Sequence, residues 1–302
     1  MVQTHRIKTI AIAGCTAVGK SDTALKLAAE FNGVLIGADS MQIYRGFDIG
    51  TGKLTKAECG GIEHKLIDIV DGDADFSVGE YVERARAAIS ETNERNKLPI
   101  IVGGTGMYLY SLLSGCNFAN TPKDETLRQK LKLASHVFGG NTMHKLLRNI
   151  DVVSAGKISP NDCKRTIRAL EIYLLNGTPK SEAVSQDKPY DDLTIVLTLP
   201  RELLYDKINL RVKKMFDDGL IEETMGLLKY KNYGSMQALG YKQISADPTA
   251  AREQLEQITA QKTRNYAKRQ MTYFNNMKLN KVFIDARNYA EISRTVRRFI
   301  GE

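Results

Sequence analysis

A phosphate-loop pattern near the amino end most constrains the fold of this chain, since residues 14–21 read GCTAVGKS and match G-x-x-x-x-G-K-[ST]. The apolar run TIAIA precedes the loop and a segment with helical spacing follows it, as the motif requires. Glycines let backbone N–H groups turn inward, Lys20 can reach phosphate oxygens, and the Ser21 hydroxyl can ligate Mg²⁺. The sequence therefore predicts a site for a phosphorylated ligand, formed by Gly14, Cys15, Thr16, Ala17, Val18, Gly19, Lys20 and Ser21.

Strand-like and helix-like segments alternate through the first 115 residues. The strand-like runs read KTIAIA, GVLIGADS, HKLIDIV and LPIIVGG, and helical spacing is found from residue 20 to about 31 and near 78–96. The second helix begins with a capping box, in which Ser77 and Glu80 can satisfy exposed backbone N–H groups reciprocally. This order of segments predicts a parallel α/β sheet.

The pattern changes in the middle of the chain and then returns. It is helical and polar at about 116–190, strand-like at 193–199, helical at about 201–230 and 252–278, and strand-like again at 281–285. The expected fold class is α/β, with a P-loop NTPase-like parallel sheet flanked by helices and an inserted helical domain. We expect residues 1–115 and 191–302 to form the α/β core and 116–190 to form the insertion.

Length and composition are those of a globular protein, because 302 residues can bury one large core and a smaller second one. No apolar run is long enough to span a bilayer, and the first apolar segment is too short for a signal peptide. We therefore expect a cytoplasmic protein that does not bind a membrane. Four scattered cysteines support neither a disulfide framework nor a zinc site, and length and charge favour a monomer.

Positive charge is concentrated near the carboxyl end. The whole chain has a formal charge of +8, and residues 262–298 contain ten basic and two acidic side chains. A helix here would place cations and rings on one arc, namely Lys262, Tyr266, Arg269 and Tyr273, and apolar side chains opposite, namely Ala267, Met271 and Phe274. Such a face is typical of nucleic-acid binding, although a solvated basic helix explains the charge alone equally well.

The residues at the ends of two predicted strands indicate what kind of ligand the site binds. The run LPIIV ends in GGTG at 103–106 instead of the acidic residue that supports Mg²⁺ in hydrolytic NTPases. The run GVLIGA ends in DSMQ at 39–42, which is the edge where doubly wound sheets bind ligands. We therefore expect Asp39 to face the phosphate loop, while a turn or a helix cap is the alternative role for an aspartate at this place.

Taken together, the motifs resemble the tRNA dimethylallyltransferases, also called isopentenyl-tRNA transferases. The matching stretches read GCTAVGKS, DSMQIYRGFDIGTGK, HKLIDIV, FSVGEY, IIVGGTGMY, NDCKRTIRALE, INLRVKKM, ALGYKQ and AKRQMTYF, and the likeness runs from residue 10 to about residue 285. It implies that the phosphate loop holds the diphosphate of dimethylallyl diphosphate. The prenyl group would move to the exocyclic amine of the adenine just 3′ of the tRNA anticodon, with diphosphate as the leaving group.

The resemblance and the chemistry together suggest a role for each group in the site. Asp39 would orient the amine and accept its proton. Lys20, the loop amides and Mg²⁺ on Ser21 would stabilise charge on the departing diphosphate, with Thr16 near the bridging oxygen and Arg211 as a further cation. An arginine on a helix also commonly covers apolar surface or forms ion pairs, which is the alternative for Arg211.

The resemblance also implies an RNA surface that includes the insertion and binds the anticodon stem-loop, whose adenine must leave its stack to react. The residues implied to contact tRNA are Asp39, Ser40, Met41, Gln42, Thr105, Arg128, Lys164, Arg165, Thr166, Ile167, Arg168, Met236, Gln237, Ala238, Leu239, Gly240, Tyr241, Lys268, Arg269, Gln270, Met271, Thr272 and Tyr273. Tyr108 and Tyr241 fit core positions equally well.

Three positions depart from the family pattern, since Cys15, Glu63 and Gln243 stand where proline, histidine and glutamate are usual. None of them removes a group assigned to the chemistry. A thiol at a helix start tends to have a lowered pKa, which would make Cys15 sensitive to oxidants. The alternative is a plain small-residue substitution.

Three other activities fit parts of the sequence. An adenylate isopentenyltransferase performs the same chemistry on free AMP or ADP, but it needs no large RNA surface. A small-molecule kinase would use ATP in the same loop, but the GGTG strand end offers it no metal-binding carboxylate. A non-catalytic RNA-binding protein would have no function for the phosphate loop or for Asp39.

Overall fold

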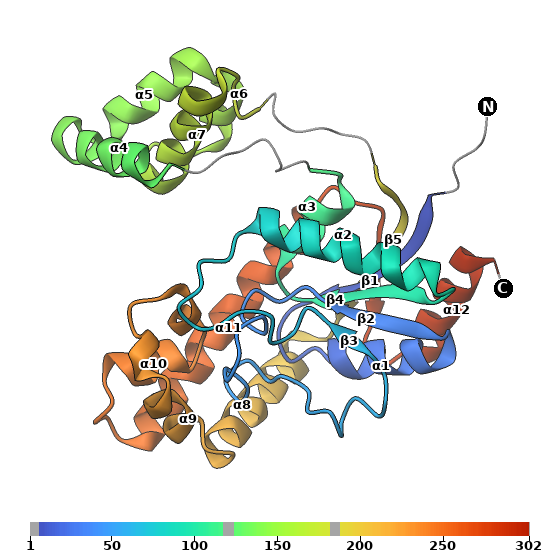
Figure 1. Ribbon diagram of the computed structural model, residues 1–302. Coiled ribbons are helices and arrows are strands. Elements are labelled where there is room, and N and C mark those ends of the chain that lie inside the picture. Colours follow the sequence, from blue (N-terminus) through green and yellow to red (C-terminus); the bar gives the residue numbers. More distant parts are fainter. Residues whose placement is uncertain (1–5, 117–123, 182–187, 302) are drawn as a thin grey trace, which may run out of the picture. The chain divides into compact units, whose positions relative to one another are not determined.

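The computed structural model describes residues 6–116, 124–181 and 188–301 (Figure 1). The chain divides into two compact units. The α/β unit consists of Met1–Ser114 and Lys188–Glu302, and the helical unit consists of Gly115–Asp187. Among the helices of the described ranges, none combines the length and the apolar character needed to cross a bilayer.

Six strands of the described residues form one sheet in the order β3-β2-β4-β1-β5-β6. They are β1 (Ile7–Gly14), β2 (Gly33–Gly37), β3 (His64–Lys65), β4 (Leu98–Gly103), β5 (Tyr190–Thr198) and β6 (Lys281–Asp285). Every pairing is parallel, so the carboxyl ends of all the strands meet at one edge. The predicted parallel α/β sheet is confirmed. Its central strand β1 is buried over residues 9–14, which explains the unbroken run of small and β-branched side chains there.

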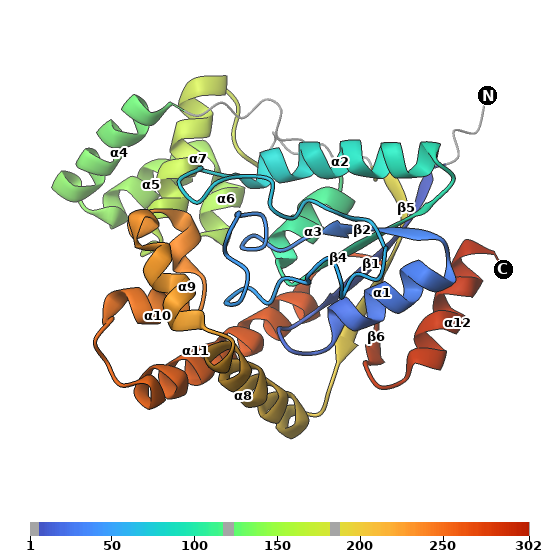
Figure 2. The ribbon, with the colours of Figure 1, turned by 60° about the horizontal axis from the view of Figure 1, so that its bottom comes forward.

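Helices cover both faces of the sheet (Figures 1 and 2). Helices α1 (Lys20–Glu30) and α12 (Tyr289–Ile300) share a core with β1, while α2 (Val78–Glu94) and α3 (Gly106–Leu113) lie on the other face. The predicted capping box opens α2, with the Ser77 hydroxyl accepting from the Glu80 N–H and the Glu80 carboxylate accepting from Ser77.

A second group of helices follows β5. Helix α8 (Arg201–Asp217) packs against the long helix α11 (Arg252–Asn276). Between them lie α9 (Leu220–Gly226), the 3₁₀ turns η1 (Leu228–Tyr230) and η2 (Gly234–Gln237), and α10 (Tyr241–Ala246). These helices matter to the site because α8, α9, α10 and α11 each contribute side chains to the loops described below.

Two elements are shorter than the sequence pattern predicted. The run at 64–70 is a strand only at His64–Lys65, because Leu66 and Asp68 adopt φ angles of 62° and 55° that an extended strand does not contain. The helix expected over 201–230 is broken after Asp217, since Gly219 has a left-handed φ of 100° and starts the short helix α9 instead. Local apolar periodicity did not reveal either break.

The helical unit has a core of its own. Its described helices are α4 (Glu125–Phe138), α5 (Gly140–Ile150), α6 (Val152–Lys157) and α7 (Cys163–Asn176). Leu131, Leu147 and Leu170 belong to one buried apolar cluster that joins α4, α5 and α7. An aspartate caps three of these helices, with Asp124, Asp151 and Asp162 each accepting from a backbone N–H of the first turn.

Candidate active site at the carboxyl edge of the sheet

The phosphate loop connects β1 to α1 with two glycines in conformations that other residues avoid. Gly14 has a φ of 143°, and a Cβ there would lie 2.9 Å from the Leu197 carbonyl oxygen on the neighbouring strand β5. Gly19 has a φ of 103° and immediately precedes α1. The loop therefore closes tightly against the sheet and directs its backbone toward the start of the helix.

Lys20 bends back over this loop, and its Nζ donates to the Cys15 carbonyl oxygen at 2.8 Å. Burial lowers the pKa of the Lys20 ammonium to about 8. The Asp39 carboxylate opposes this effect and the Arg211 guanidinium adds to it. Lys20, Asp39 and Arg211 are thus close enough to influence one another, although the chain separates Lys20 and Arg211 by almost two hundred positions.

Asp39 follows β2 at the same edge of the sheet. Its Oδ1 accepts from the Met41 N–H at 2.9 Å, so the carboxylate also has the turn-forming role that the sequence left open. Burial lowers the pKa of Lys20 and of Arg211, and the charge of Asp39 raises both. For Tyr266, burial and the charge of Asp39 both raise the pKa, which is about 12. Three elements therefore place a cation or a hydroxyl near this one carboxylate.

The end of β4 is tied to the end of β2. The Ser40 N–H donates to the Thr105 Oγ1 at 2.9 Å, and the Thr105 hydroxyl donates to the Ser40 Oγ at 3.2 Å. A Cβ on Gly103 would lie 2.1 Å from the Ala38 carbonyl oxygen, so only glycine permits this approach. The GGTG sequence therefore brings Thr105 and the 39–42 segment together.

Gln270 of α11 joins the phosphate loop to β4. Its Oε1 accepts from the Thr16 N–H at 2.9 Å, and its Nε2 donates to the Gly104 carbonyl oxygen at 2.9 Å. The side chain is 7% exposed. The resemblance implied a tRNA contact for Gln270, and the geometry gives it a bridging position between two loops that the sequence did not indicate.

Arg211 of α8 contacts a tight turn formed by residues 47–53. Its Nη2 donates to the Thr51 carbonyl oxygen at 3.1 Å, and a Cβ on Gly52 would lie 2.2 Å from the same guanidinium nitrogen. Burial lowers the pKa of Arg211, and the Asp39 charge raises it. The Gln42 Nε2 donates to the same Thr51 oxygen at 3.1 Å. One backbone carbonyl therefore orients both Arg211 and Gln42.

The predicted faces of α11 are found in part, since Tyr266 and Met271 are both half-buried. Lys262, Arg269 and Tyr273 are exposed, whereas Ala267 and Phe274 are buried. The exposed Arg269 guanidinium lies 5.6 Å from the centroid of the half-buried Tyr266 ring, so a cation and an aromatic ring are interleaved here. The remaining predicted contacts on this helix are the exposed Lys268 and Thr272 and the half-buried Met271.

Several other positions implied to contact tRNA lie inside the protein. Tyr241, Met236 and Ala238 are buried, while Gln237 is exposed and Leu239 is half-buried. Tyr108 is 6% exposed and stacks on Tyr81 with ring centroids 4.0 Å apart. Tyr108 and Tyr241 therefore occupy the core positions that the sequence left open for them.

In the helical unit, the predicted arginines are paired with acids. The buried Glu171 carboxylate accepts from Arg128 at 3.0 Å and from Arg168 at 2.8 Å. Arg165 lies 3.3 Å from Asp162. Thr166 and Ile167 are buried and Lys164 is exposed. Glu171 was not singled out from the sequence, because its partners come from two different helices.

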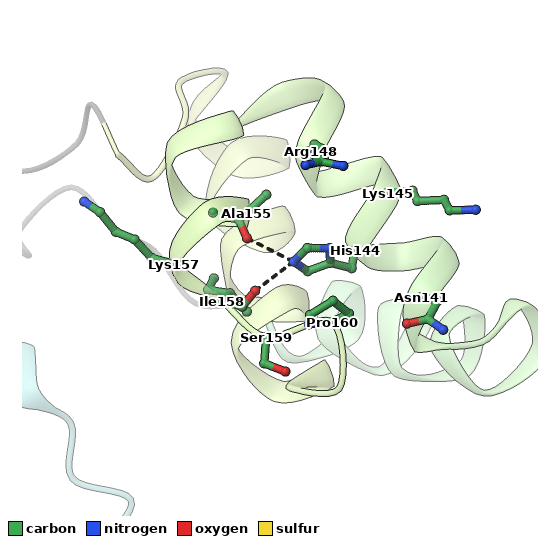
Figure 3. Close-up of a pocket in the computed structure, with 10 residues that line it drawn as sticks. Asn141, His144, Lys145, Arg148, Ala155, Lys157, Ile158, Ser159 and Pro160 are labelled. Atoms are coloured by element: carbon green, nitrogen blue, oxygen red, sulfur yellow. Dashed lines mark hydrogen bonds between the residues drawn. The ribbon is translucent and has the colours of Figure 1, made fainter.

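A basic pocket of about 570 Å³ lies in the helical unit, lined by Asn141, His144, Lys145, Arg148, Ala155, Gly156, Lys157, Ile158, Ser159 and Pro160 (Figure 3). The His144 Nε2 lies 3.1 Å from the Ala155 carbonyl oxygen and 2.8 Å from that of Ile158, so this nitrogen carries the proton. Lys145 and Lys157 extend to opposite sides of the pocket. Within the described ranges, no carboxylate pairs with Lys145, Arg148 or Lys157. No pattern in the sequence indicated this pocket.

Cys15 does not have the activated thiol that one interpretation of the sequence proposed. The residue is 1% exposed, and burial raises the pKa of its thiol although Lys20 acts in the opposite direction. The helix begins at Lys20, five positions further on, so the thiol does not sit at its first turn. Burial and the raised pKa therefore oppose the oxidant-sensitive interpretation and favour the small-residue substitution.

The other two departures have local partners. Glu63 lies 2.8 Å from Arg95 and 3.3 Å from Lys65 in a surface network. The Gln243 Oε1 accepts from the Gly240 N–H at 2.8 Å at the start of α10. Neither side chain belongs to the carboxyl edge of the sheet, so these substitutions leave the candidate site unchanged.

The fold and the site define an α/β enzyme of the P-loop type, with its phosphate loop, a lysine, an arginine and one carboxylate at the carboxyl edge of a parallel sheet. Comparisons with known proteins narrow this class. The IPP transferase family model matches residues 42–277. The tRNA dimethylallyltransferase of Caldanaerobacter subterraneus subsp. tengcongensis is 42% identical over 309 residues, covering 98% of each chain. That of Bacillus cereus is 42% identical over 310 residues, covering 100% of this chain and 97% of its own.

Solved structures agree with this match. The full-length tRNA isopentenylpyrophosphate transferase of Bacillus halodurans is similar with a TM-score of 0.72 at 38% identity, covering 97% of both chains. A eukaryotic dimethylallyltransferase acting on tRNA is similar with a TM-score of 0.84 at 28% identity, covering 97% of this chain and 77% of its own. The chain belongs to the IPP transferase family and is a transferase.

Proposed function

We propose that this enzyme transfers the dimethylallyl group of dimethylallyl diphosphate to the exocyclic amine of the adenine 3′-adjacent to the anticodon in tRNA, releasing diphosphate. The curated relatives are named tRNA dimethylallyltransferases. The observation that carries the proposal is the position of Asp39 near both Lys20 and Arg211, where its negative charge raises the pKa of each cation. A base and two anion-binding cations are the groups that this reaction needs.

The diphosphate would bind at the phosphate loop. Its oxygens would replace the Cys15 carbonyl as the partner of Lys20, and a charged ligand would restore the solvation that the lysine loses on burial. Arg211 would supply a second cation, and Thr16 would lie near the bridging oxygen. These groups stabilise the charge that accumulates on the leaving group, and that charge governs the barrier for an allylic diphosphate.

Asp39 would act on the nucleophile. An adenine amine is a weak nucleophile because its lone pair is delocalised into the ring. As the bond from nitrogen to the allylic carbon forms, the bond from that carbon to oxygen breaks and its electron pair leaves with diphosphate. The amine becomes acidic during this step, so the Asp39 carboxylate can accept the proton that the nitrogen loses.

The residues at the loop suit Mg²⁺ as a partner of the substrate more than as a resident ion. Ser21 offers a hydroxyl in the first turn of α1, and Asp39 is the nearby carboxylate. The described residues contain no group of three or more histidine, cysteine or acidic side chains placed to hold a metal. Mg²⁺ commonly binds through one or two protein oxygens plus substrate phosphates. When bound, it would neutralise charge on the diphosphate.

The tRNA would lie along the exposed face of α11 and on the helical unit, which we propose is an RNA-binding insertion in an α/β catalytic core. Arg269 and Tyr273 can engage phosphates and stack on bases. Lys145, Arg148 and Lys157 around the basic pocket, which have no carboxylate partner among the described residues, would contact phosphates of the anticodon stem. We further propose that the enzyme works as a monomer and, because its substrate is tRNA, that it acts in the cytoplasm.

One assay tests the proposal against its alternatives. Radiolabelled dimethylallyl diphosphate is incubated with the protein and total tRNA, and in parallel with AMP and with ADP. We expect label in RNA only. Label in the free nucleotide would instead identify an adenylate isopentenyltransferase. A kinase would give no prenyl transfer and would move label from γ-labelled ATP to a small acceptor.

A further inference from the structure

The turn at 47–53 is fastened by a single carboxylate from helix α9. Glu223 accepts from three consecutive backbone N–H groups, those of Asp48 at 3.3 Å, Ile49 at 3.0 Å and Gly50 at 3.3 Å. The Tyr241 hydroxyl donates to the same carboxylate and accepts from the Gly50 N–H at 3.0 Å. Four donors therefore converge on one side chain.

This arrangement depends on the negative charge of Glu223. Successive N–H groups that point the same way form a concave site for an anion, and hydrogen bonds to a charged acceptor are about twice as strong as neutral ones. No lysine, arginine or histidine within the described ranges pairs with Glu223, so these N–H groups and the tyrosine balance its charge. Burial and the Glu223 carboxylate both raise the pKa of Tyr241, which keeps its hydroxyl protonated as a donor.

The turn that Glu223 holds also contains the residues that contact Arg211. Thr51 follows Gly50, and its carbonyl oxygen accepts from Arg211 and from Gln42. Gly52 lies against the guanidinium so closely that any Cβ there would displace it. Gly50 lies equally close to the Tyr241 ring, at 2.4 Å for a Cβ placed there. A shift of the turn would therefore move the partner that fixes the arginine.

We infer that Glu223 is a positioning residue for the diphosphate site and acts through the backbone of the turn on Arg211. This inference rests on the proposed role of Arg211 in binding diphosphate. Among the described residues, Glu223 forms no hydrogen bond with the phosphate loop or with Asp39. Its effect is transmitted in three steps, from the carboxylate to the 48–50 amides, from those amides to the Thr51 carbonyl, and from that carbonyl to the guanidinium.

The first test measures binding of inorganic diphosphate to the full-length protein by calorimetry. Glu223→Gln keeps the shape of the side chain but places an amide NH₂ against N–H donors. We expect diphosphate to bind about tenfold more weakly, a loss in the range expected when a binding group is displaced by a fraction of an ångström. Glu222→Gln is the matched control, because it removes the same charge from an exposed neighbour on the same helix, and its affinity should stay within about twofold of the parent.

The second test separates positioning from a general loss of structure. If Glu223 acts through Arg211, adding Glu223→Gln to Arg211→Gln should weaken diphosphate binding by less than about twofold further. Tyr241→Phe, which removes one of the four donors, should show a smaller loss in the same direction, with the native fold retained by circular dichroism. Affinity for tRNA should stay near that of the parent in each variant.

Three results would overturn the inference. They are unchanged diphosphate binding in Glu223→Gln, a full tenfold loss on top of Arg211→Gln, or unchanged binding in Arg211→Gln itself, which would also remove Arg211 from the proposed site. The proposed function fails by a different result. A protein that binds diphosphate as described but transfers no prenyl group to tRNA would refute the activity and leave the role of Glu223 intact.

Discussion

The phosphate-loop edge of the α/β unit and the basic pocket of the helical unit both offer positive groups to an anion, but they hold these groups differently. At the edge, Lys20 and Arg211 already donate to backbone carbonyls, and burial lowers the pKa of each. Around the pocket, Lys145, Arg148 and Lys157 have no acidic partner among the described residues. The first region suits one ligand in one orientation, and the second suits a repeating polyanion.

The two designs respond differently to salt, pH and mutation. Screening by salt is weak for buried groups and strong for exposed ones. Loss of one prearranged group at the edge should therefore produce a large, specific defect. Loss of one exposed cation should produce a small defect that depends on ionic strength.

The largest effect is expected for Asp39→Ala. Loss of the base should lower turnover by roughly 10²–10⁴-fold, the usual contribution of general base catalysis, while tRNA affinity stays near that of the parent. Asp39→Asn keeps an oxygen for the Met41 N–H and separates the turn from the base. Single-turnover rates and tRNA binding measured on the same preparations check this. Equal losses of rate and binding would contradict the base assignment.

The next effect concerns Lys20 and pH. Lys20→Met should weaken binding of inorganic diphosphate by roughly a hundredfold, as expected when one partner of a buried charge pair is removed. The pKa of Lys20 is lowered to about 8, so the ammonium is charged below that pH and neutral above it. Affinity of the parent protein should therefore fall as pH rises through about 8. Calorimetry between pH 6.5 and 9.5 should show no such fall in Lys20→Met.

A smaller effect is expected for the basic pocket. Arg148→Ala should raise the KM for tRNA by a few-fold and reduce the slope of log affinity against log salt concentration by about 0.7–0.9, which corresponds to one lost phosphate contact. The KM for dimethylallyl diphosphate should not change. Lys130→Ala is the matched control, because Lys130 is an exposed cation of the same helical unit outside the pocket. An identical slope in both variants would show that the pocket does not bind RNA.

The smallest effect is expected for Cys15. Burial raises the pKa of its thiol, so the reactive thiolate is scarce at neutral pH. Treatment with hydrogen peroxide should leave activity largely intact, and Cys15→Pro should behave in the same way. Rapid inactivation of the parent that is absent in Cys15→Pro would show that the thiol is accessible after all.

Much of the core was predictable because its signals are local. The strand, loop and helix around residues 14–21, the capping box at Ser77 and the faces of α11 each depend on residues within a few turns of one another. The run HKLIDIV misled the prediction, since apolar content does not reveal that Leu66 and Asp68 take positive φ. The conformation of this run depends on its tertiary contacts rather than on its apolar content.

The groups that organise the site could not be predicted, because each joins distant parts of the chain. Gln270 bridges Thr16 and Gly104 from a helix more than 160 positions away from either. Glu223 holds a turn about 175 positions before it. In the sequence, the resemblance implied a tRNA contact for Gln270 but not its bridging role, and Glu223 looks like an ordinary polar residue on a helix. The basic pocket was missed for a different reason: α5 and the 155–160 segment are close in sequence, but local periodicity does not show that they pack around a shared cavity.

The register of β1 against β5 has a consequence for how the protein is made. Ile7 pairs with Tyr190 and Gly14 with Leu197, so one side of the central strand stays uncovered until the ribosome has passed residue 190. At typical elongation rates the delay is roughly 10–40 s. During this interval the nascent chain presents an unpaired, apolar strand edge. Because Gly14 closes against Leu197, the phosphate loop reaches its final shape only after most of the polypeptide has been synthesised.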